Sequence, residues 1–227
     1  MLKRLAGAGV ATEERAGRIV AAPSDAKEMA ALVAVVRDAG SRVVHEWTPA
    51  EMAGPATVAL SYENAGGVRE VAAPDLLAVV EPGTTAAELE DFLVSQGLYW
   101  PVADFTEPTG RIGDTVAGAP GAWTPTGNVI RRHILALEAV LADGTLLRVG
   151  PRTVKCVTGY DLKQLFTGSA GTLGLISGLT LRLEAVAARE AVRARYERDF
   201  DGLDAGPVCL AGAGCRACGA AGSTAVT

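Results

Sequence analysis

The order of apolar and polar positions predicts a chain that begins with alternating strands and helices. Arg18–Ala22 is an apolar run of strand length. A helix is expected over 25–39, because Asp25 and Glu28 resemble a capping box at its start. The apolar run Arg42–His45 predicts the next strand. These elements together form a predicted β-α-β unit.

The middle of the chain predicts shorter strands and a second capped helix. Strands are expected at Val58–Leu60 and Leu76–Val80. Thr85 and Glu88 have the spacing of a capping box, and Gly97 ends the helix that they begin. This helix therefore follows the predicted strand Leu76–Val80.

The last third of the chain predicts a hairpin and several short elements. Ile134–Ala142 and Leu146–Val149 are apolar runs on either side of Asp143 and Gly144, a strong turn signal. The remaining predictions are a short helix or turn at 112–117, one or two helical turns at 161–166, and strands at 173–176 and 179–183.

Composition narrows the class of protein. The chain has 227 residues, a hydrophobic share of 49% and a formal net charge of −5. An acidic chain without a long basic run argues against nucleic acid as a partner. Glu13, Glu14 and Arg15 interrupt the first apolar stretch too early for a signal peptide, and no window reaches membrane-spanning length. A cytoplasmic protein is expected.

Two glycine-rich segments carry the candidate chemistry. Gly110–Gly121 reads GRIGDTVAGAPG, and Thr158–Ile176 reads TGYDLKQLFTGSAGTLGLI. Such dense small residues let the backbone approach a ligand closely and can leave amide groups free to face anionic oxygens. The alternative for each segment is a tight structural corner without a ligand.

The order and spacing of these segments resemble the FAD-binding domain of the vanillyl-alcohol-oxidase/PCMH flavoprotein family. The first matches the family pattern T-I-G-G-x-V-A-x-N-A-x-G in part, and the second matches G-Y-D-L-x-x-L-x-x-G-S-x-G-T-L-G-x-I almost throughout, followed by Thr180, Arg182 and Leu183. Within the family, the FAD subunits of glycolate and D-lactate oxidases and dehydrogenases are the most similar.

The resemblance implies an α+β fold with two lobes and a flavin in the groove between them. The N-terminal lobe would hold the β-α-β unit, and the larger lobe a mixed or antiparallel sheet. The domain is expected at 18–184, preceded by an extension at 1–17 and followed by a loose tail at 185–227. The implied cofactor is non-covalent FAD, and the implied cofactor-binding residues are Gly113, Thr115, Val116, Ala117, Gly121, Gly171, Gly174, Leu175 and Ile176. Replacing Gly174 with valine is expected to expel flavin and leave much of the fold, because a new Cβ would enter the space of the ring.

Two departures from the family pattern lower the expected affinity for FAD. Relatives carry a phosphate cradle such as R-G-x-G-T-x-x-x-G after the second strand, whereas the segment from His45 to Gly54 contains one glycine and two glutamates. Asp114 stands where the second glycine of the first motif is expected, and a carboxylate there repels a phosphate unless it points away. Either the diphosphate of FAD is held mainly by the second lobe, or FAD binding is weak or lost.

The remaining reactive side chains leave alternatives open. His45 lies near the position where some relatives attach flavin covalently, but a surface or core histidine fits its surroundings better. Arg131, Arg132 and His133 either face an anionic group or form an ordinary solvated loop. No metal site is expected. The cysteines at 209, 215 and 218 are free thiols, or part of a tail that contacts an iron–sulfur partner.

Two functions from different classes follow. In the first, the chain is the FAD-binding subunit of an oxidoreductase that acts on a small 2-hydroxy acid, with an iron–sulfur or catalytic partner subunit. In the second, it is a non-catalytic scaffold with the same fold and weakened or lost FAD binding. Full-size family members carry a substrate domain after the flavin domain, and no catalytic residue can be assigned here. The lone chain is therefore expected to lack activity.

Overall fold

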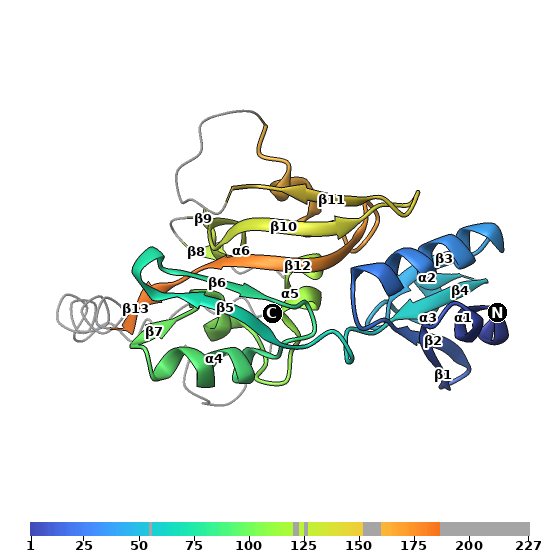
Figure 1. Ribbon diagram of the computed structural model, residues 1–227, viewed down its shortest axis with the longest axis horizontal. Helices are drawn as coiled ribbons and strands as arrows, with labels where there is room; N and C mark the ends of the chain where they lie inside the picture. The colour runs from blue at the N-terminus through green and yellow to red at the C-terminus, as the bar shows by residue number, and fades with distance from the viewer. Residues whose placement is uncertain (55, 120–122, 125–126, 152–159, 187–227) are drawn as a thin grey trace, which may run out of the picture.

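The protein folds into two lobes that lie side by side (Figure 1). The computed structural model describes residues 1–54, 56–119, 123–124, 127–151 and 160–186. The smaller lobe contains α1 (Leu2–Gly7), β1 (Ala11–Arg15), β2 (Arg18–Ala22), α2 (Ala26–Asp38), β3 (Arg42–His45), α3 (Ala50–Ala53) and β4 (Thr57–Leu60). Its sheet has the order β1-β2-β4-β3, in which β4 runs parallel to β2 and β3, so the predicted β-α-β unit is confirmed.

The caps predicted for α2 are present. The side chain of Asp25 accepts a hydrogen bond from the Glu28 amide at 2.8 Å, and the Ser24 amide donates to Glu28 Oε2 at 2.8 Å. These contacts satisfy amide groups that the first helical turn leaves open. The apolar face of α2 is buried through Met29, Leu32, Val33 and Val36.

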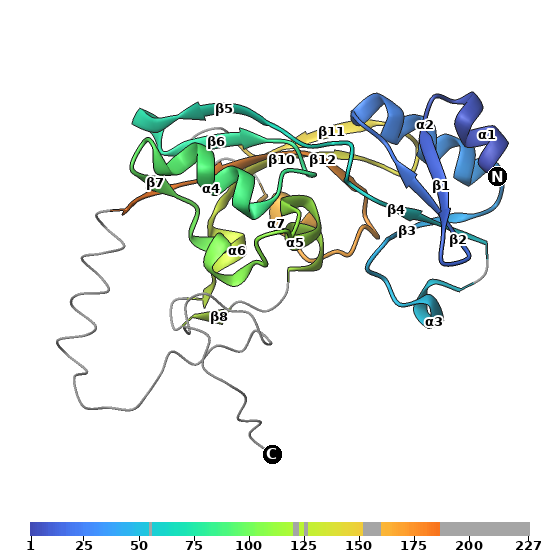
Figure 2. The same ribbon diagram turned by 90° about the horizontal axis from the view of Figure 1, so that it is seen from below.

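The larger lobe is built on a five-stranded antiparallel sheet with the order β11-β10-β12-β6-β5. The five strands are β5 (Val68–Ala72), β6 (Leu77–Val80), β10 (Ile134–Val140), β11 (Leu146–Val149) and β12 (Leu175–Arg182). The short helices lie on one face of this sheet, and Figure 2 shows α4, α5, α6 and α7 beneath it. The other elements are η1 (Ala73–Asp75), α4 (Ala86–Val94), β7 (Leu98–Tyr99), η2 (Pro101–Phe105), α5 (Ile112–Gly118), β8 (Trp123–Thr124), β9 (Gly127–Asn128), α6 (Val129–Arg132), α7 (Lys163–Phe166) and β13 (Glu184–Ala185).

Two local predictions in the larger lobe are also confirmed. Thr85 and Glu88 form a full capping box at the start of α4. The turn between β10 and β11 is closed by the Leu141 amide donating to the Thr145 carbonyl at 2.9 Å, with Gly144 at φ +88°. Both features depend on residues close in sequence.

One strand prediction was wrong. The segment 173–183, expected to form two strands, forms the single strand β12. Glu138 pairs with Gly178 and Ala139 pairs with Ile176, so Ser177 is an extra residue in a bulge opposite β10. The bulge lets the strand continue through Gly178 where a break was expected.

The sequence patterns also left two segments unassigned. Residues 1–17 carry α1 and β1, and β1 pairs with β2 along its whole length. Val68–Ala72 forms the edge strand β5. The predicted tail lies outside the described residues except for 185 and 186, and the predicted domain limits stay predictions. None of the helices in the described ranges is long and apolar enough to cross a membrane.

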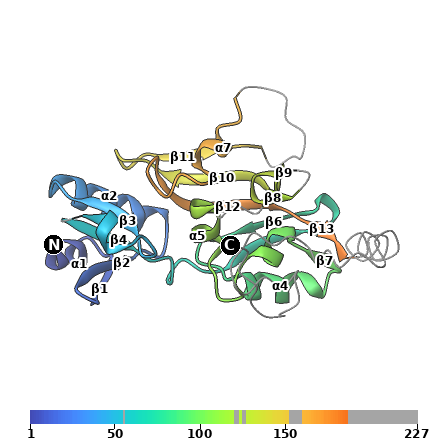
Figure 3. The ribbon, with the colours of Figure 1, turned by 180° about the vertical axis from the view of Figure 1, so that it is seen from behind.

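The two lobes share part of their cores. Val140 and Leu175 of the larger lobe belong to the same buried cluster as Met29, Leu32 and Val36 of α2. Arg37 on α2 also donates to the Ala142 carbonyl at 3.5 Å. Seen from behind, the turn between β10 and β11 reaches over to α2 (Figure 3). The two lobes are therefore in direct contact between α2 and the β10–β11 turn.

Candidate functional site

The structure brings the two glycine-rich segments together at the groove between the lobes. The Gly168 amide donates to the Val116 carbonyl at 2.9 Å, and the Ala170 amide donates to the Ala117 carbonyl at 2.9 Å. The end of α5 is thus joined to the loop that enters β12. Gly121 lies outside the described residues.

The α5 residues predicted to bind the cofactor are buried within the protein. The Gly113 amide donates to the Pro82 carbonyl at 2.7 Å, and the Thr115 amide donates to the Arg111 carbonyl at 3.0 Å. A Cβ at Gly113 would lie 2.6 Å from Cβ of Pro82 and 2.9 Å from Cε2 of Tyr62. Position 113 therefore requires a glycine because Pro82 and Tyr62 pack against it. The amides of Gly113 and Thr115 already have acceptors within the protein. A direct contact of this turn with a cofactor stays a prediction.

The glycines of the second segment also meet protein atoms. A Cβ at Gly174 would lie 2.9 Å from the Val140 carbonyl oxygen and 3.3 Å from Cε1 of Phe166. A valine at position 174 would therefore strike the core, and its expected effect on a flavin ring stays a prediction. Leu175 and Ile176 begin β12 and pair with β10.

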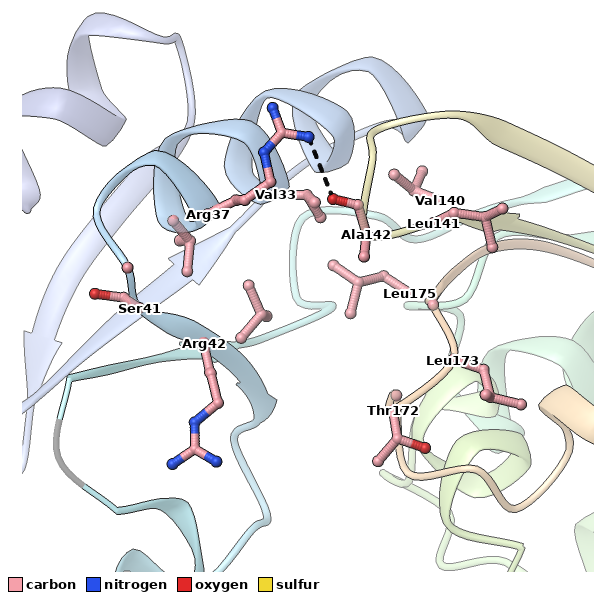
Figure 4. A pocket seen from close by; sticks show the side chains of 15 residues that line it. Val33, Arg37, Ser41, Arg42, Val140, Leu141, Ala142, Thr172, Leu173 and Leu175 are labelled. Carbon is pink, nitrogen blue, oxygen red and sulfur yellow. Dashed lines mark hydrogen bonds between the residues drawn. The ribbon is translucent and has the colours of Figure 1, made fainter.

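A cavity of about 450 Å³ opens between the lobes beside this segment (Figure 4). Its smaller-lobe wall comes from the end of α2 and the start of β3, and its larger-lobe wall from the β10–β11 turn and residues 171–175. Apolar side chains form most of the walls, and Arg37 and Arg42 stand at the edge. The volume is in the range of small-molecule sites. Three of the predicted residues, Gly171, Gly174 and Leu175, line it.

The loop after β3 does not form a phosphate cradle. Three of its amides donate within the protein: Thr48 to the His45 carbonyl at 2.9 Å, and Met52 and Ala53 to the Pro49 carbonyl at 3.0 Å each. Part of the loop is the short helix α3 in place of a run of glycines. The loop therefore lacks the set of converging free amides that holds a diphosphate.

His45 and Trp47 of this loop instead contact Asp114 on α5. His45 Nδ1 lies 3.2 Å from Asp114 Oδ1, and Trp47 Nε1 donates to the same oxygen at 3.1 Å. The two rings stack with centroids 5.2 Å apart. We call His45, Trp47 and Asp114 the latch, because the cluster joins the smaller lobe to the larger one.

The latch is partly buried and negatively charged at Asp114. His45 is 1% exposed, so it is a core histidine, and its Nε2 has no hydrogen-bond partner. Tyr62 lies next to His45 with ring centroids 5.7 Å apart. Burial, and then the charge of Asp114, raise the pKa of the Tyr62 hydroxyl well above its usual range. The Asp114 charge thus acts across this part of the groove.

The second histidine has an internal partner. His133 Nε2 lies 3.1 Å from Glu184 Oε1, and Tyr99 donates its hydroxyl to the other oxygen of that carboxylate at 3.2 Å. Arg131 donates to the Thr167 carbonyl at 3.2 Å. His133 and Arg131 therefore have partners inside the protein, and whether this segment also faces an anionic ligand stays a prediction. The four cysteines lie outside the described residues.

Sequence reasoning missed Trp47 and Tyr62 as residues of the groove. Asp114 had been singled out because of its charge, but its neighbours could not be inferred. Trp47 lies 67 positions away from it and Tyr62 lies one strand beyond the loop, so no local pattern connects the three.

The chain is similar to known proteins over most of its described length. The model of a family described as an FAD binding domain matches residues 17–150. The D-2-hydroxyglutarate dehydrogenase of Stutzerimonas stutzeri is 31% identical over 155 residues, which are 68% of this chain and 33% of that protein. The D-lactate dehydrogenase of Archaeoglobus fulgidus is 32% identical over 171 residues, 73% of this chain and 38% of that protein.

The chain is also similar in sequence to an oxidase subunit and in fold to a solved structure. The glycolate oxidase subunit GlcD of Bacillus subtilis is 31% identical over 125 residues, 55% of this chain and 27% of that protein. The structure of BBE-like 1 from Physcomitrella patens has a TM-score of 0.66 at 18% identity, and the match covers 82% of this chain and 44% of that one. The chain thus spans 33% and 38% of the length of the two dehydrogenases named above.

Proposed function

This chain belongs to the FAD-binding domain family, and from that membership we propose that it is the flavin-binding component of an oxidoreductase that acts on a small 2-hydroxy acid. Three similar proteins are named for D-2-hydroxyglutarate, D-lactate and glycolate, which are all 2-hydroxy acids. The two-lobed α+β fold supports the proposal. A bound flavin would accept electrons from the substrate, and this chain would position the cofactor.

The groove between the lobes is the observation that carries the proposal. The cavity there has apolar walls, which suit a planar ring, and arginines at its edge, which suit an anion. Three of the predicted cofactor residues line the cavity. These features support binding of the planar parts of FAD in the groove, whereas the loop after β3 offers no such support for its diphosphate.

The substrate and the partner also belong to the proposal. The match covers about a third of each dehydrogenase, so the residues that orient and deprotonate a 2-hydroxy acid are expected on another domain or a partner subunit. GlcD is a subunit of a glycolate oxidase, which favours a complex. A cytoplasmic location and a non-covalent cofactor remain part of the proposal.

A scaffold role is the second candidate. The loop after β3 and the latch favour a scaffold role. A domain without a diphosphate cradle can keep its fold and lose the cofactor. In this candidate the domain would support a partner that carries the flavin. The two candidates differ in whether the purified chain holds flavin.

A binding and reduction experiment separates the candidates. The purified chain is loaded with FAD, passed through a desalting column and examined for flavin absorbance. The loaded protein is then mixed without oxygen with glycolate, D-lactate or D-2-hydroxyglutarate, alone and with a candidate partner subunit. Retained flavin that is bleached only with the partner present supports the proposed function. A colourless protein after desalting contradicts it and favours the scaffold.

A further inference from the structure

Among the described residues, the carboxylate of Asp114 forms no ion pair with an arginine or lysine. It is on α5, and its side chain is 30% exposed. Within the part of the chain that the structure describes, its contacts are the ring of His45 and the indole of Trp47. A site that binds a phosphorylated ligand normally has the opposite charge at this position.

Two other carboxylates near the loop share one arginine. Arg15 Nη1 lies 2.7 Å from Glu46 Oε1, and Arg15 Nη2 lies 3.2 Å from Glu63 Oε2. Glu13 also pairs with this guanidinium, so its single positive charge is shared among three carboxylates. Asp114 adds to this excess of negative charge, because among the described ion pairs it has no arginine or lysine partner.

The latch fixes the position of the Asp114 carboxylate. Trp47 donates to Asp114 Oδ1 from one side and His45 lies against the same atom, and the two rings stack on each other. Gly171, which lines the cavity, lies so close to the His45 ring that a Cβ there would be 2.9 Å from Nε2. The carboxylate is thus held between the loop after β3 and α5, and the His45 ring separates it from Gly171 in the cavity wall.

We propose that Asp114, held by His45 and Trp47, is a specificity determinant that disfavours flavins carrying a diphosphate relative to riboflavin, which carries no phosphate. The reason is like-charge repulsion between the carboxylate and the phosphates, which acts on FAD and leaves riboflavin unaffected. This inference rests on the proposed function, because it assumes that the groove accepts a flavin.

The test compares two ligands on matched variants. Asp114→Asn removes the charge and keeps an oxygen that can accept from Trp47. Asp91→Asn removes the same charge from the exposed surface of α4, which lies away from the groove (Figure 1). The affinities of the wild-type protein and both variants for FAD and for riboflavin are measured by fluorescence titration at low and high salt. Thermal unfolding of each protein checks that the fold is intact.

The expected result is a selective gain. Asp114→Asn should bind FAD roughly three- to tenfold more tightly at low salt, and the gain should shrink at high salt because ions screen the repulsion. Riboflavin affinity should not change, and Asp91→Asn should behave as the wild type. An unchanged or weaker affinity for FAD, or an equal gain for both ligands, overturns the inference while the proposed function stands. If no protein binds either flavin, the proposed function fails and the inference fails with it.

Discussion

The imidazole of His45 lies so close to Gly171 that a β-carbon at position 171 would be 2.9 Å from His45 Nε2. This contact joins the end of β3 in the smaller lobe to the loop before β12 in the larger one. Because Gly171 also has φ +75°, both its backbone conformation and its lack of a side chain are required there. The packing of the lobes is thus tied to the segment predicted to bind the cofactor.

Gly171→Ala should therefore destabilise the protein by more than its backbone conformation alone explains. An alanine in the left-handed region costs about 1–2 kcal/mol, and contact with His45 adds to that cost. Gly97→Ala is the matched control, because Gly97 has φ +65° and no atom within 4 Å of a new Cβ. Urea unfolding of both variants measures the difference. Equal losses for the two variants would show that the contact with His45 contributes nothing.

Gly174→Val should damage the fold as well as any flavin binding. Its new Cβ would meet the Val140 carbonyl oxygen at 2.9 Å, and backbone cannot move aside as a flexible side chain can. Overpacking of this kind costs about 1–3 kcal/mol or more. Thermal unfolding of the apoprotein tests this, because it requires no cofactor. An unchanged melting temperature together with loss of flavin would support the explanation based on the ring.

Glu88→Ala should lower stability in a pH-dependent way. Hydrogen bonds from the Thr85 backbone and then its side chain lower the pKa of Glu88 below its ordinary value. The stabilisation is therefore present above the pKa of the unfolded chain and is lost as the pH falls through the lower, folded-state value. The variant should lose about 1 kcal/mol at pH 7 and less at pH 3. Urea unfolding at both values measures this, with Asp91→Ala on the same helix as control. A loss that does not depend on pH would contradict the assigned role of the charge.

Arg42→Gln should weaken FAD binding if the cavity receives part of the cofactor. The Arg42 guanidinium stands at the edge of the cavity and donates to the Ala53 carbonyl at 3.4 Å. Removing a partly exposed cation from beside an anion should cost roughly three- to tenfold in affinity, with less effect at high salt. Arg4→Gln on α1 removes an exposed cation away from the cavity and serves as control. Equal affinities of Arg42→Gln and wild type would place the cofactor elsewhere.

The sequence by itself determined the elements whose causes are local. The cap of α2 at Asp25, the capping box of α4 and the Asp143-Gly144 turn all depend on hydrogen bonds between residues at most a few positions apart. The match of the second glycine segment also indicated the family, because a long run of residues in fixed order leaves few alternatives. The two-lobed α+β class followed from that match and is confirmed.

Only the tertiary structure decided what surrounds the residues of the groove. Gly171 meets His45 from 126 positions away, and Asp114 meets Trp47 from 67 positions away. Which atoms meet across a lobe interface depends on how two separately folded sheets pack, and no short sequence pattern records that packing. For the same reason the sequence pointed to glycines as contacts for a flavin, whereas the structure shows that Gly113, Gly171 and Gly174 first make room for the protein itself.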